Sequence, residues 1–341
     1  MSTAIKVMRQ IQVGIESTPG MAVDAVERMI VQGKYEWEQA TWDPVDVDSG
    51  VFARVPTSPV ITRNASRVEM SAPIDFTQIL LPLLTGMEGG VTPTGAMADK
   101  TWAFLPDTAA PPSLDTATVE YAEASPDDVS ELEFYYGFTD QMKFTLTSEG
   151  IGEMMWSMWG RATQQGTLTA ALGVPALIRP ANLLWRVDVD DTWAGLGTTN
   201  IPAQVYGAEW SYNNNTRPGY YLDGRTALDF TQPEYGRPAG EIFLDVVHDP
   251  DSASFVEDEE TNKAALTQRF IQLQVTGPSL GGSAYSITLN MACYHAEDSM
   301  QTRGEDRDGN PSVRMHFLSA YDATSTNHVG VTVVNAETSF G

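Results

Sequence analysis

Apolar and polar residues alternate one by one in most segments of this chain that show any periodicity, and this pattern constrains the fold more than any other feature. The clearest case runs from Tyr285 to Cys293, where Tyr, Ile, Leu, Met and Cys occupy the odd positions and Ser, Thr, Asn and Ala the even ones. Because successive side chains of a strand point to opposite faces, this spacing predicts a strand with one buried face. A chain built from such segments is expected to bury them in antiparallel sheets.

Similar segments recur along the whole sequence. Those in the last quarter predict a four-strand antiparallel meander, formed by residues 271–275, 285–293, 313–317 and 329–333. Further strands are predicted at 134–138, 142–147, 183–189, 205–213 and 241–248. The predicted fold class is mainly β, an antiparallel β-sandwich or barrel.

One segment has helical spacing instead. After Pro73, apolar residues recur every three or four positions as far as Leu84, and Gly86 suits the end of a helix. We predict a single short packing helix over about 73–86. Pro82 is expected to kink it or end it early, because proline lacks a backbone donor and clashes with the preceding turn.

Between these elements lie polar or proline-rich connections that are expected to be surface loops. They are residues 89–100, 106–116 and the acidic stretch 249–260, which we interpret as a loop or insertion over 249–262.

The 341 residues correspond to two domains at about 150 residues each, although one all-β domain holds up to about 250. A break marked by Pro and Gly at 173–180 divides a first β-rich half, 21–175, from a second, 176–341, and the two halves can also form one composite domain. Each half contains an aromatic-Gly-Arg tripeptide, 159–161 and 235–237, so an internal repeat is an open alternative.

Acidic residues outnumber basic ones by 45 to 20, which gives a formal net charge of -25. Nucleic-acid affinity depends mainly on Lys and Arg neutralising phosphates, so this composition argues against a nucleic-acid-binding module. The one cysteine, Cys293, excludes an internal disulfide and any multi-cysteine metal site, and it fits a reducing compartment.

Neither a signal peptide nor a membrane span is expected from the sequence. Lys6, Arg9 and Gln10 interrupt the apolar residues of the opening segment, which therefore lacks a continuous apolar run. The longest strongly apolar stretch, 79–84, is far shorter than the roughly 20 residues that cross a bilayer as a helix.

Motifs for catalysis are weak throughout. Cys293 and His295 face the same way on their predicted strand, as a thiolate-imidazole pair requires, but a buried cysteine that acts as a small hydrophobe explains the same pattern. Asp188 and Asp191 have the chemistry of paired catalytic acids, but a solvated charge run is the usual explanation of such residues. The loop that starts at Asp306 resembles a calcium loop, but its glycine stands at the fourth position instead of the sixth, and Phe317 replaces the glutamate of the twelfth position. We therefore predict no catalytic, cofactor-binding or metal-binding residue.

An apolar cluster runs from Met154 to Trp159. Strand spacing places Met154, Trp156 and Met158 on one face and Met155 and Trp159 on the other. Burial on both faces would indicate either core packing or contact with a neighbouring subunit, and the sequence does not separate the two.

Several segments, taken in order, resemble the major tail tube proteins of long non-contractile-tailed, siphovirus-like bacteriophages. The segments are GIESTPGMAV from Gly14, 71–86 followed by Trp102-Ala103-Phe104, 144–150 ending in Trp159-Gly160-Arg161, WSYNNN from Trp210, GRPAGEI from Gly236, and the terminal strand 329–336. The chain is large for this family, and the acidic stretch at 249–260 has the character of an insertion, such as a decorating surface loop.

The resemblance implies a β-sandwich or barrel-like structural subunit, without enzymatic activity, that self-assembles into hexameric rings. Stacked rings would form the tail tube of the virion, assembled in the host cytoplasm, with tape measure, tail terminator and distal tail proteins as partners and no membrane contact. It also implies an N-terminal arm over 1–20. The candidate assembly residues are Glu16, Thr18, Pro19, Gly20, Trp156, Trp159, Asn213, Asn214 and Asn215.

The acidic composition fits such a tube independently of the resemblance. Carboxylates that face the channel repel phosphates, so double-stranded DNA passes during ejection without specific binding. Two other functions stay open at this stage: a carbohydrate-binding or carbohydrate-acting β-sandwich that uses the Trp-rich strands with Asp188 and Asp191, and a capsid decoration protein.

Overall fold

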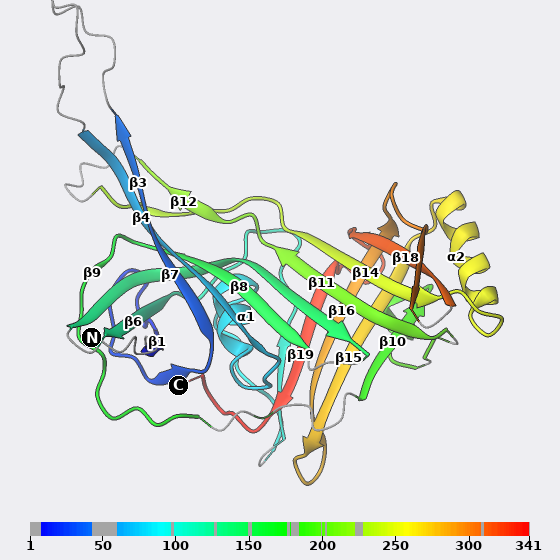
Figure 1. Ribbon diagram of the computed structural model, residues 1–341, viewed down its shortest axis with the longest axis horizontal. Helices are drawn as coiled ribbons and strands as arrows, with labels where there is room; N and C mark the ends of the chain where they lie inside the picture. Colours follow the sequence, from blue (N-terminus) through cyan, green and yellow to red (C-terminus); the bar gives the residue numbers. More distant parts are fainter. Residues whose placement is uncertain are drawn as a thin grey trace, which may run out of the picture.

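The computed structural model describes residues 8–42, 60–96, 99–125, 128–148, 152–175, 178, 184–198, 200–201, 203–221, 228–307 and 310–340. The protein is mainly β, built from one large antiparallel sheet and two α-helices (Figure 1), which confirms the prediction of a mainly β, antiparallel fold. Among the described residues, no helix is long and apolar enough to cross a membrane.

The first half contains β1 (Met8–Ile15), β2 (Glu27–Met29), β3 (Gln32–Trp42), β4 (Val60–Pro73), α1 (Leu80–Gly86), β5 (Lys100–Phe104), β6 (Ala117–Ser125), β7 (Asp128–Thr147), β8 (Glu153–Gly160) and β9 (Gln164–Gln165). The second half contains β10 (Leu184–Asp190), a 3-10 turn (Trp193–Gly195), β11 (Val205–Asn213), β12 (Arg217–Gly219), β13 (Gln232–Glu234), β14 (Ala239–Val247), α2 (Ala253–Ala265), β15 (Arg269–Ser279), β16 (Ala284–His295), β17 (Gln301–Arg307), β18 (Asn310–Ser319) and β19 (Val329–Asn335).

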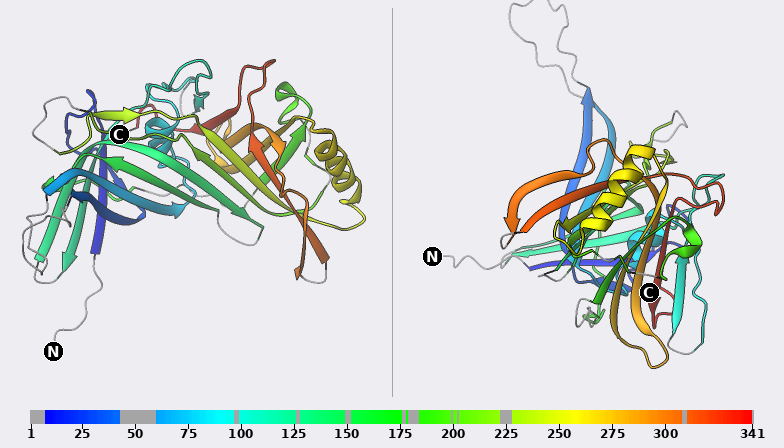
Figure 2. Two further views of the ribbon diagram at one scale, coloured as in Figure 1. Left: turned by 90° about the horizontal axis from the view of Figure 1, so that it is seen from above. Right: turned by 90° about the vertical axis from the view of Figure 1, so that its right-hand side faces the viewer.

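Eight strands follow one another in the order β3-β4-β8-β7-β11-β14-β18-β17, and every neighbouring pair is antiparallel. We call this array the main sheet. The view from above shows it as an arch that runs from the blue strands of the first half to the orange strands of the second (Figure 2).

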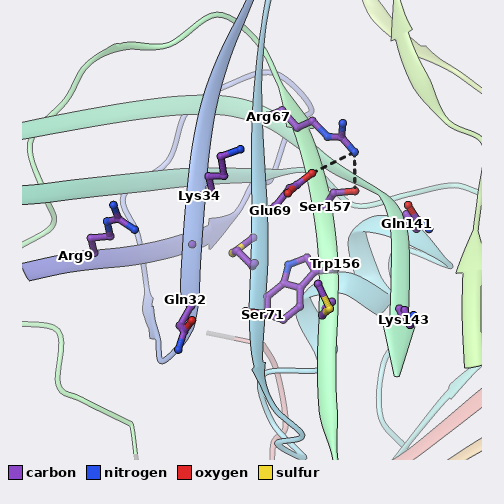
Figure 3. Close-up of a pocket in the computed structure, with 13 residues that line it drawn as sticks. Arg9, Gln32, Lys34, Arg67, Glu69, Ser71, Gln141, Lys143, Trp156 and Ser157 are labelled. Carbon is purple, nitrogen blue, oxygen red and sulfur yellow. Dashed lines mark hydrogen bonds and ion pairs between the residues drawn. The ribbon is translucent and has the colours of Figure 1, made fainter. Parts of the chain in front are cut away.

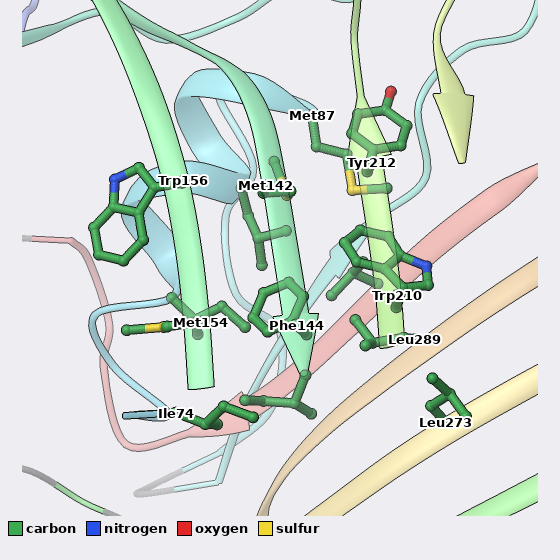
Figure 4. Close-up of a cluster of buried hydrophobic side chains, with 14 of the residues drawn as sticks. Ile74, Met87, Met142, Phe144, Met154, Trp156, Trp210, Tyr212, Leu273 and Leu289 are labelled. Carbon is green, nitrogen blue, oxygen red and sulfur yellow. The ribbon is translucent and has the colours of Figure 1, made fainter. Parts of the chain in front are cut away.

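Five strands form a second layer, in the order β10-β15-β16-β19-β5, which joins the main sheet where the end of β16 pairs with β18. Apolar side chains of both layers meet between them. Phe144 and Trp210 of the main sheet, with ring centroids 5.4 Å apart, point toward the layer that carries Leu273 and Leu289 (Figure 4). All four side chains are buried, so this contact forms the centre of the core.

Strand β7 connects the main sheet to a smaller sheet at the N-terminal end. Its first part pairs with β6 and β9, its second part pairs with β8 and β11, and β1 pairs with both β2 and β6. Tyr136 has a φ of 59° where the pairing with β6 shifts register, a left-handed conformation that is costly for a bulky residue. The strand therefore changes sheets at this residue.

The alternating segments of the sequence are strands, as predicted, and the residues expected to face inward in β7 and β14 are buried. In β11 Ala208, Trp210 and Tyr212 are buried as expected, whereas Tyr206 is half-buried where the pairing with β14 shifts register. The predicted meander at the C-terminal end is wrong. β19 lies next to β16, β18 pairs mainly with β14, and the strand β17 precedes β18. Alternation fixes which residues form strands but not which strands become neighbours.

The helix predicted over 73–86 is shorter than expected and begins at Leu80. Asp75 accepts hydrogen bonds from the backbone N–H groups of Thr77 and Gln78, both at 2.9 Å, so a turn replaces the first part of the predicted helix. Pro82 does not break α1, because it lies in the first turn, where its missing N–H needs no partner. Gly86 is the last helical residue, and a Cβ there would lie 2.7 Å from Cβ of Thr139, so the glycine allows close packing on β7.

The acidic stretch predicted as a loop or insertion over 249–262 is mostly the helix α2. Phe255, Val256 and Glu259 are buried on one side, whereas Glu257 and Glu260 are exposed. With only two apolar residues facing inward, the sequence lacks the apolar stripe that marks a packed helix, which is why the pattern indicated a solvated run.

The expected N-terminal arm over 1–20 is also corrected for its described part. Residues 8–15 form β1, which pairs with β6 along its whole length, from Met8 opposite Ala124 to Ile15 opposite Ala117. Residues 1–7 lie outside the described residues. Deleting 1–20 would therefore remove a strand of the folded body.

Candidate functional site

The main sheet has one side packed on the core and one side turned away from it, which we call the exposed face. On β7, Met142, Phe144 and Leu146 are buried, while Gln141 and Lys143 between them lie on the exposed face. The directly opposed residues of the neighbouring strands follow the same alternation, so the exposed face continues across the sheet.

Carboxylates outnumber cations on the exposed face of strands β3, β4, β8, β7, β11, β14 and β18. The carboxylates are Glu36, Glu38, Glu69, Asp140, Glu153, Glu209, Glu241 and Asp245, and the cations are Lys34, Arg63, Arg67, Lys143 and Arg314. Over the described side chains of these seven strands, eight negative charges against five positive ones give the face a net negative charge, the same sign as that of the whole chain.

A shallow groove of about 410 Å³ lies on this face where β3, β4, β7 and β8 meet (Figure 3). Arg67 reaches Glu69 and Asp140 at 3.8 Å each, and Lys143 reaches Glu209 at 2.8 Å. Lys34 is paired with Glu36 in the same way. Because each of these cations already has a carboxylate partner, the groove does not have the free positive charge that a phosphate site needs.

Three of the residues expected from the sequence to serve assembly line one hollow of about 650 Å³ on the same face: Trp159, Asn213 and Asn215. The indole N–H of Trp159 donates to Asp140 at 3.0 Å, and the guanidinium of Arg67 lies 5.1 Å from the ring centre. The hollow is therefore partly built from residues that the sequence singled out.

Trp156 and Asn214, in contrast, lie inside the protein. Trp156 is 3% exposed in the core, whereas its neighbour Met155 is 49% exposed, so the cluster from Met154 to Trp159 is not buried on both faces. Asn214 donates through Nδ2 to the carbonyl oxygens of Gly86 and Thr139 and accepts the N–H of Thr216 through Oδ1. Asn214 thus ties α1 and β7 to the turn after β11.

Glu16 is also an internal residue, buried at 6% exposure. Its carboxylate accepts the backbone N–H groups of Gly20 and Tyr136, both at 2.7 Å, and the hydroxyls of Thr116 and Thr118. It therefore holds the turn to Gly20 against β6 and against the strained residue of β7. Thr18 and Pro19 are exposed at the tip of this turn, and Gly20 has a φ of 81°.

Replacing Glu16 by Gln is expected to destabilise the monomer by about 2–3 kcal/mol, because an amide nitrogen then faces donors that need an acceptor. Urea unfolding measures this loss, and Ser17→Ala on the exposed side of the same turn is the matched control. Equal stability of the Gln variant and wild type would contradict this role for Glu16.

A buried polar cluster beneath α2 was not expected from the sequence. Glu259 accepts from Arg269 at 2.8 Å and pairs with Nε2 of His295 at 2.9 Å, and Nδ1 of His295 lies 2.9 Å from Oγ of Ser299. Arg269 is also paired with Asp191. Glu259 and Ser299 are 0% and 4% exposed, so the cluster fixes α2 to β15 and β16 and leaves no access for a substrate. Four separate segments supply these residues, and no local motif marks them.

The residues considered for catalysis have structural partners. Asp188 is 1% exposed and accepts the N–H of Gly197 at 2.7 Å. The thiol of Cys293 donates to the carbonyl of Arg269 at 3.4 Å, and burial raises its pKa well above the usual value, which opposes thiolate formation. His295 shares its strand but bonds Glu259 and Ser299.

A carboxylate-rich hollow lies between β2 and the loop before α1, with Glu27, Asp75 and Glu337 among its lining residues. Burial, and then the charges of Glu337 and Asp75, raise the pKa of Glu27 to about 7. Among the described residues, no group of three or more His, Cys, Asp or Glu side chains is arranged to hold a metal ion.

The two outer strands of the main sheet each have one open edge. Over its described length β3 pairs only with β4, and the described residues of β17 pair only with β18. Unpaired edges present rows of backbone donors and acceptors that readily accept another strand.

Comparison of the chain with protein-family models and with curated proteins gave no match.

Proposed function

We propose that this protein is the structural subunit of a bacteriophage tail tube, in which copies join edge to edge into rings and stacked rings enclose a channel for double-stranded DNA. The observation that carries the proposal is the main sheet, with its two open edges and its net negative exposed face. The finer fold, a tail-tube-type β-sandwich, belongs to the same proposal.

Edge pairing between copies explains why two strands of the main sheet, β3 and β17, each have one open edge over their described residues. Closure of a sheet on itself satisfies the edge donors and acceptors and removes the sites at which uncontrolled aggregation begins. The exposed face then becomes the wall of the channel. Its excess of carboxylates keeps phosphates at a distance, so the DNA slides instead of adhering.

The partners that the resemblance implies belong to the proposal as well. They are the tape measure protein inside the tube, the tail terminator and distal tail proteins at its ends, and the virion tail as the location.

Electron microscopy of the purified full-length protein at high concentration tests the proposal. We expect rings or tubes of constant diameter. Dispersed monomers at all concentrations, or monomers that bind or hydrolyse oligosaccharides, would overturn it in favour of the carbohydrate-acting alternative. Single copies attached to capsids would point to a decoration protein.

A further inference from the structure

The main sheet consists of two four-stranded units with the same strand order. In the first unit the order is β3-β4-β8-β7, and in the second it is β11-β14-β18-β17. In each unit, numbered along the chain, the first strand pairs with the second, the second with the fourth, and the fourth with the third. Such an order is not the simple succession of hairpins, so its occurrence twice in one sheet indicates two copies of one design.

The elements outside the main sheet repeat in the same sequence. A helix follows the second strand of each unit, α1 after β4 and α2 after β14. Two strands that lie outside the main sheet come next, β5 and β6 in the first unit and β15 and β16 in the second. A strand that precedes each unit pairs with one of these two: β1 with β6, and β10 with β15.

The repeat lies in the topology and not in the tripeptides that suggested it in the sequence. Residues 159–161 lie at the end of the fourth strand of the first unit, whereas 235–237 lie between the first and second strands of the second unit. The units also differ in their helices, since α1 is apolar and fully buried and α2 is acidic and half exposed.

The two units are joined inside the chain by β7 and β11. These strands are antiparallel over seven residue pairs, from Gln141 opposite Asn213 to Thr147 opposite Gly207. The rings of Phe144 and Trp210 pack together at a tilt of 45° on the core side of this joint, and Lys143 pairs with Glu209 at 2.8 Å on the exposed face. The third strand of one unit thus pairs with the first strand of the next.

The two open edges of the main sheet belong to the same strand positions that pair in this joint, a third strand and a first strand. β17 is the third strand of the second unit, and β3 is the first strand of the first unit. Because β3 and β17 are the first and the last of eight strands in which every neighbouring pair is antiparallel, they run in opposite directions. When β17 of one chain meets β3 of the next, the pair is antiparallel, as β7 and β11 are.

We infer that each four-stranded unit forms one sixth of the wall of a ring, so that each chain supplies two of six wall units. Three chains then close the ring by pairing β17 of one chain with β3 of the next, whereas the resemblance implies six chains. The inference rests on the proposed tube function and specifies its self-association. Three chains of eight strands give a closed sheet of 24 strands.

The width of the channel favours three chains over six. Strands lie about 4.8 Å apart, so 24 upright strands enclose a ring about 37 Å across between backbones, and 48 strands enclose one about 73 Å across. Side chains project about 5 Å from each wall. Strand tilt widens both rings by about a third. With tilt and side chains both included, the smaller ring leaves a bore of about 39 Å, roughly twice the width of a duplex about 20 Å across, whereas the larger ring leaves about 87 Å, more than four times that width.

Native mass spectrometry and electron cryomicroscopy of rings assembled from the full-length chain test this inference. We expect a ring mass of about 112 kDa, three times the chain mass of 37.2 kDa, and threefold symmetry with six similar wall units. Rings of about 223 kDa with six chains would overturn the inference and leave the tube function standing. A ring of any other number of chains would also overturn it, and the absence of any ring would overturn the tube function itself.

Discussion

Tubes built from a chain in which Glu209, Glu241 and Asp245 are all replaced by lysine are expected to retain duplex DNA that wild-type tubes exclude. The three residues lie on the exposed face of the adjacent strands β11 and β14. Their replacement changes the charge of that face by six units per chain and places new ammonium groups beside Lys143, whose partner Glu209 is lost. Lysines that neutralise phosphates release counterions, which creates the affinity that the native face lacks.

The measurement is the amount of DNA that assembled tubes protect from nuclease, at increasing salt. If the variant makes about 6–10 phosphate contacts, its affinity for DNA should fall by roughly 10³–10⁵ between 50 and 200 mM salt. The amount of protected DNA should therefore decrease as salt increases. The matched control replaces Glu257, Asp258 and Glu260 of α2 by lysine. This variant has the same change in charge, but on a helix packed against the second layer and not on the exposed face.

Protected DNA in the sheet variant alone would support an exposed face that lines the channel. If both variants protect DNA equally, or neither does, this face does not form the channel wall. Electron microscopy of both variants confirms that tubes still form before the DNA is added.

Much of the strand content was predictable from the sequence because alternation is a local property. Trp210 and Tyr212 of β11 and Ile242 and Leu244 of β14 are buried as their spacing predicted. β17 was not predicted from the sequence, because its residues, QTRGEDR, include no large apolar side chain and so show no alternation of apolar and polar residues. Its described residues pair only with β18, which makes it an edge strand of the main sheet.

The candidate site was only partly predictable, for a related reason. The resemblance singled out Trp159, Asn213 and Asn215, and the fold brings them to one hollow, but Glu16 and Asn214 have their polar groups occupied inside the protein.

Strand order depends on pairings between residues far apart in the sequence, such as β7 with β11. No local pattern encodes these pairings, so the repeated unit and its open edges emerge only from the three-dimensional arrangement.

Replacing Glu259 by alanine is expected to destabilise the protein by about 3–5 kcal/mol, because it leaves the buried guanidinium of Arg269 and the imidazole of His295 without their shared partner. Glu259 is fully buried, and Asn262 of the same helix also donates to it at 3.2 Å. Loss of this carboxylate should therefore loosen α2 from β15 and β16 before the rest of the protein unfolds.

Denaturant unfolding measures the total loss, and hydrogen exchange of α2 measures the local one. Glu257→Ala is the matched control, since Glu257 lies in the same helix with an exposed side chain and should change the free energy of unfolding by less than about 0.5 kcal/mol. Glu259→Gln, which retains one acceptor without the charge, should lie between the two. A loss below about 1 kcal/mol for Glu259→Ala, with unchanged exchange in α2, would show that the helix is held without Glu259, by the apolar contacts of Phe255 and Val256 and by its other polar contacts. The acidic stretch would then owe its place in the fold to those apolar contacts together with Lys263, which donates to the carbonyl oxygens of Glu297 and Ser299, and Glu259 would have no structural role.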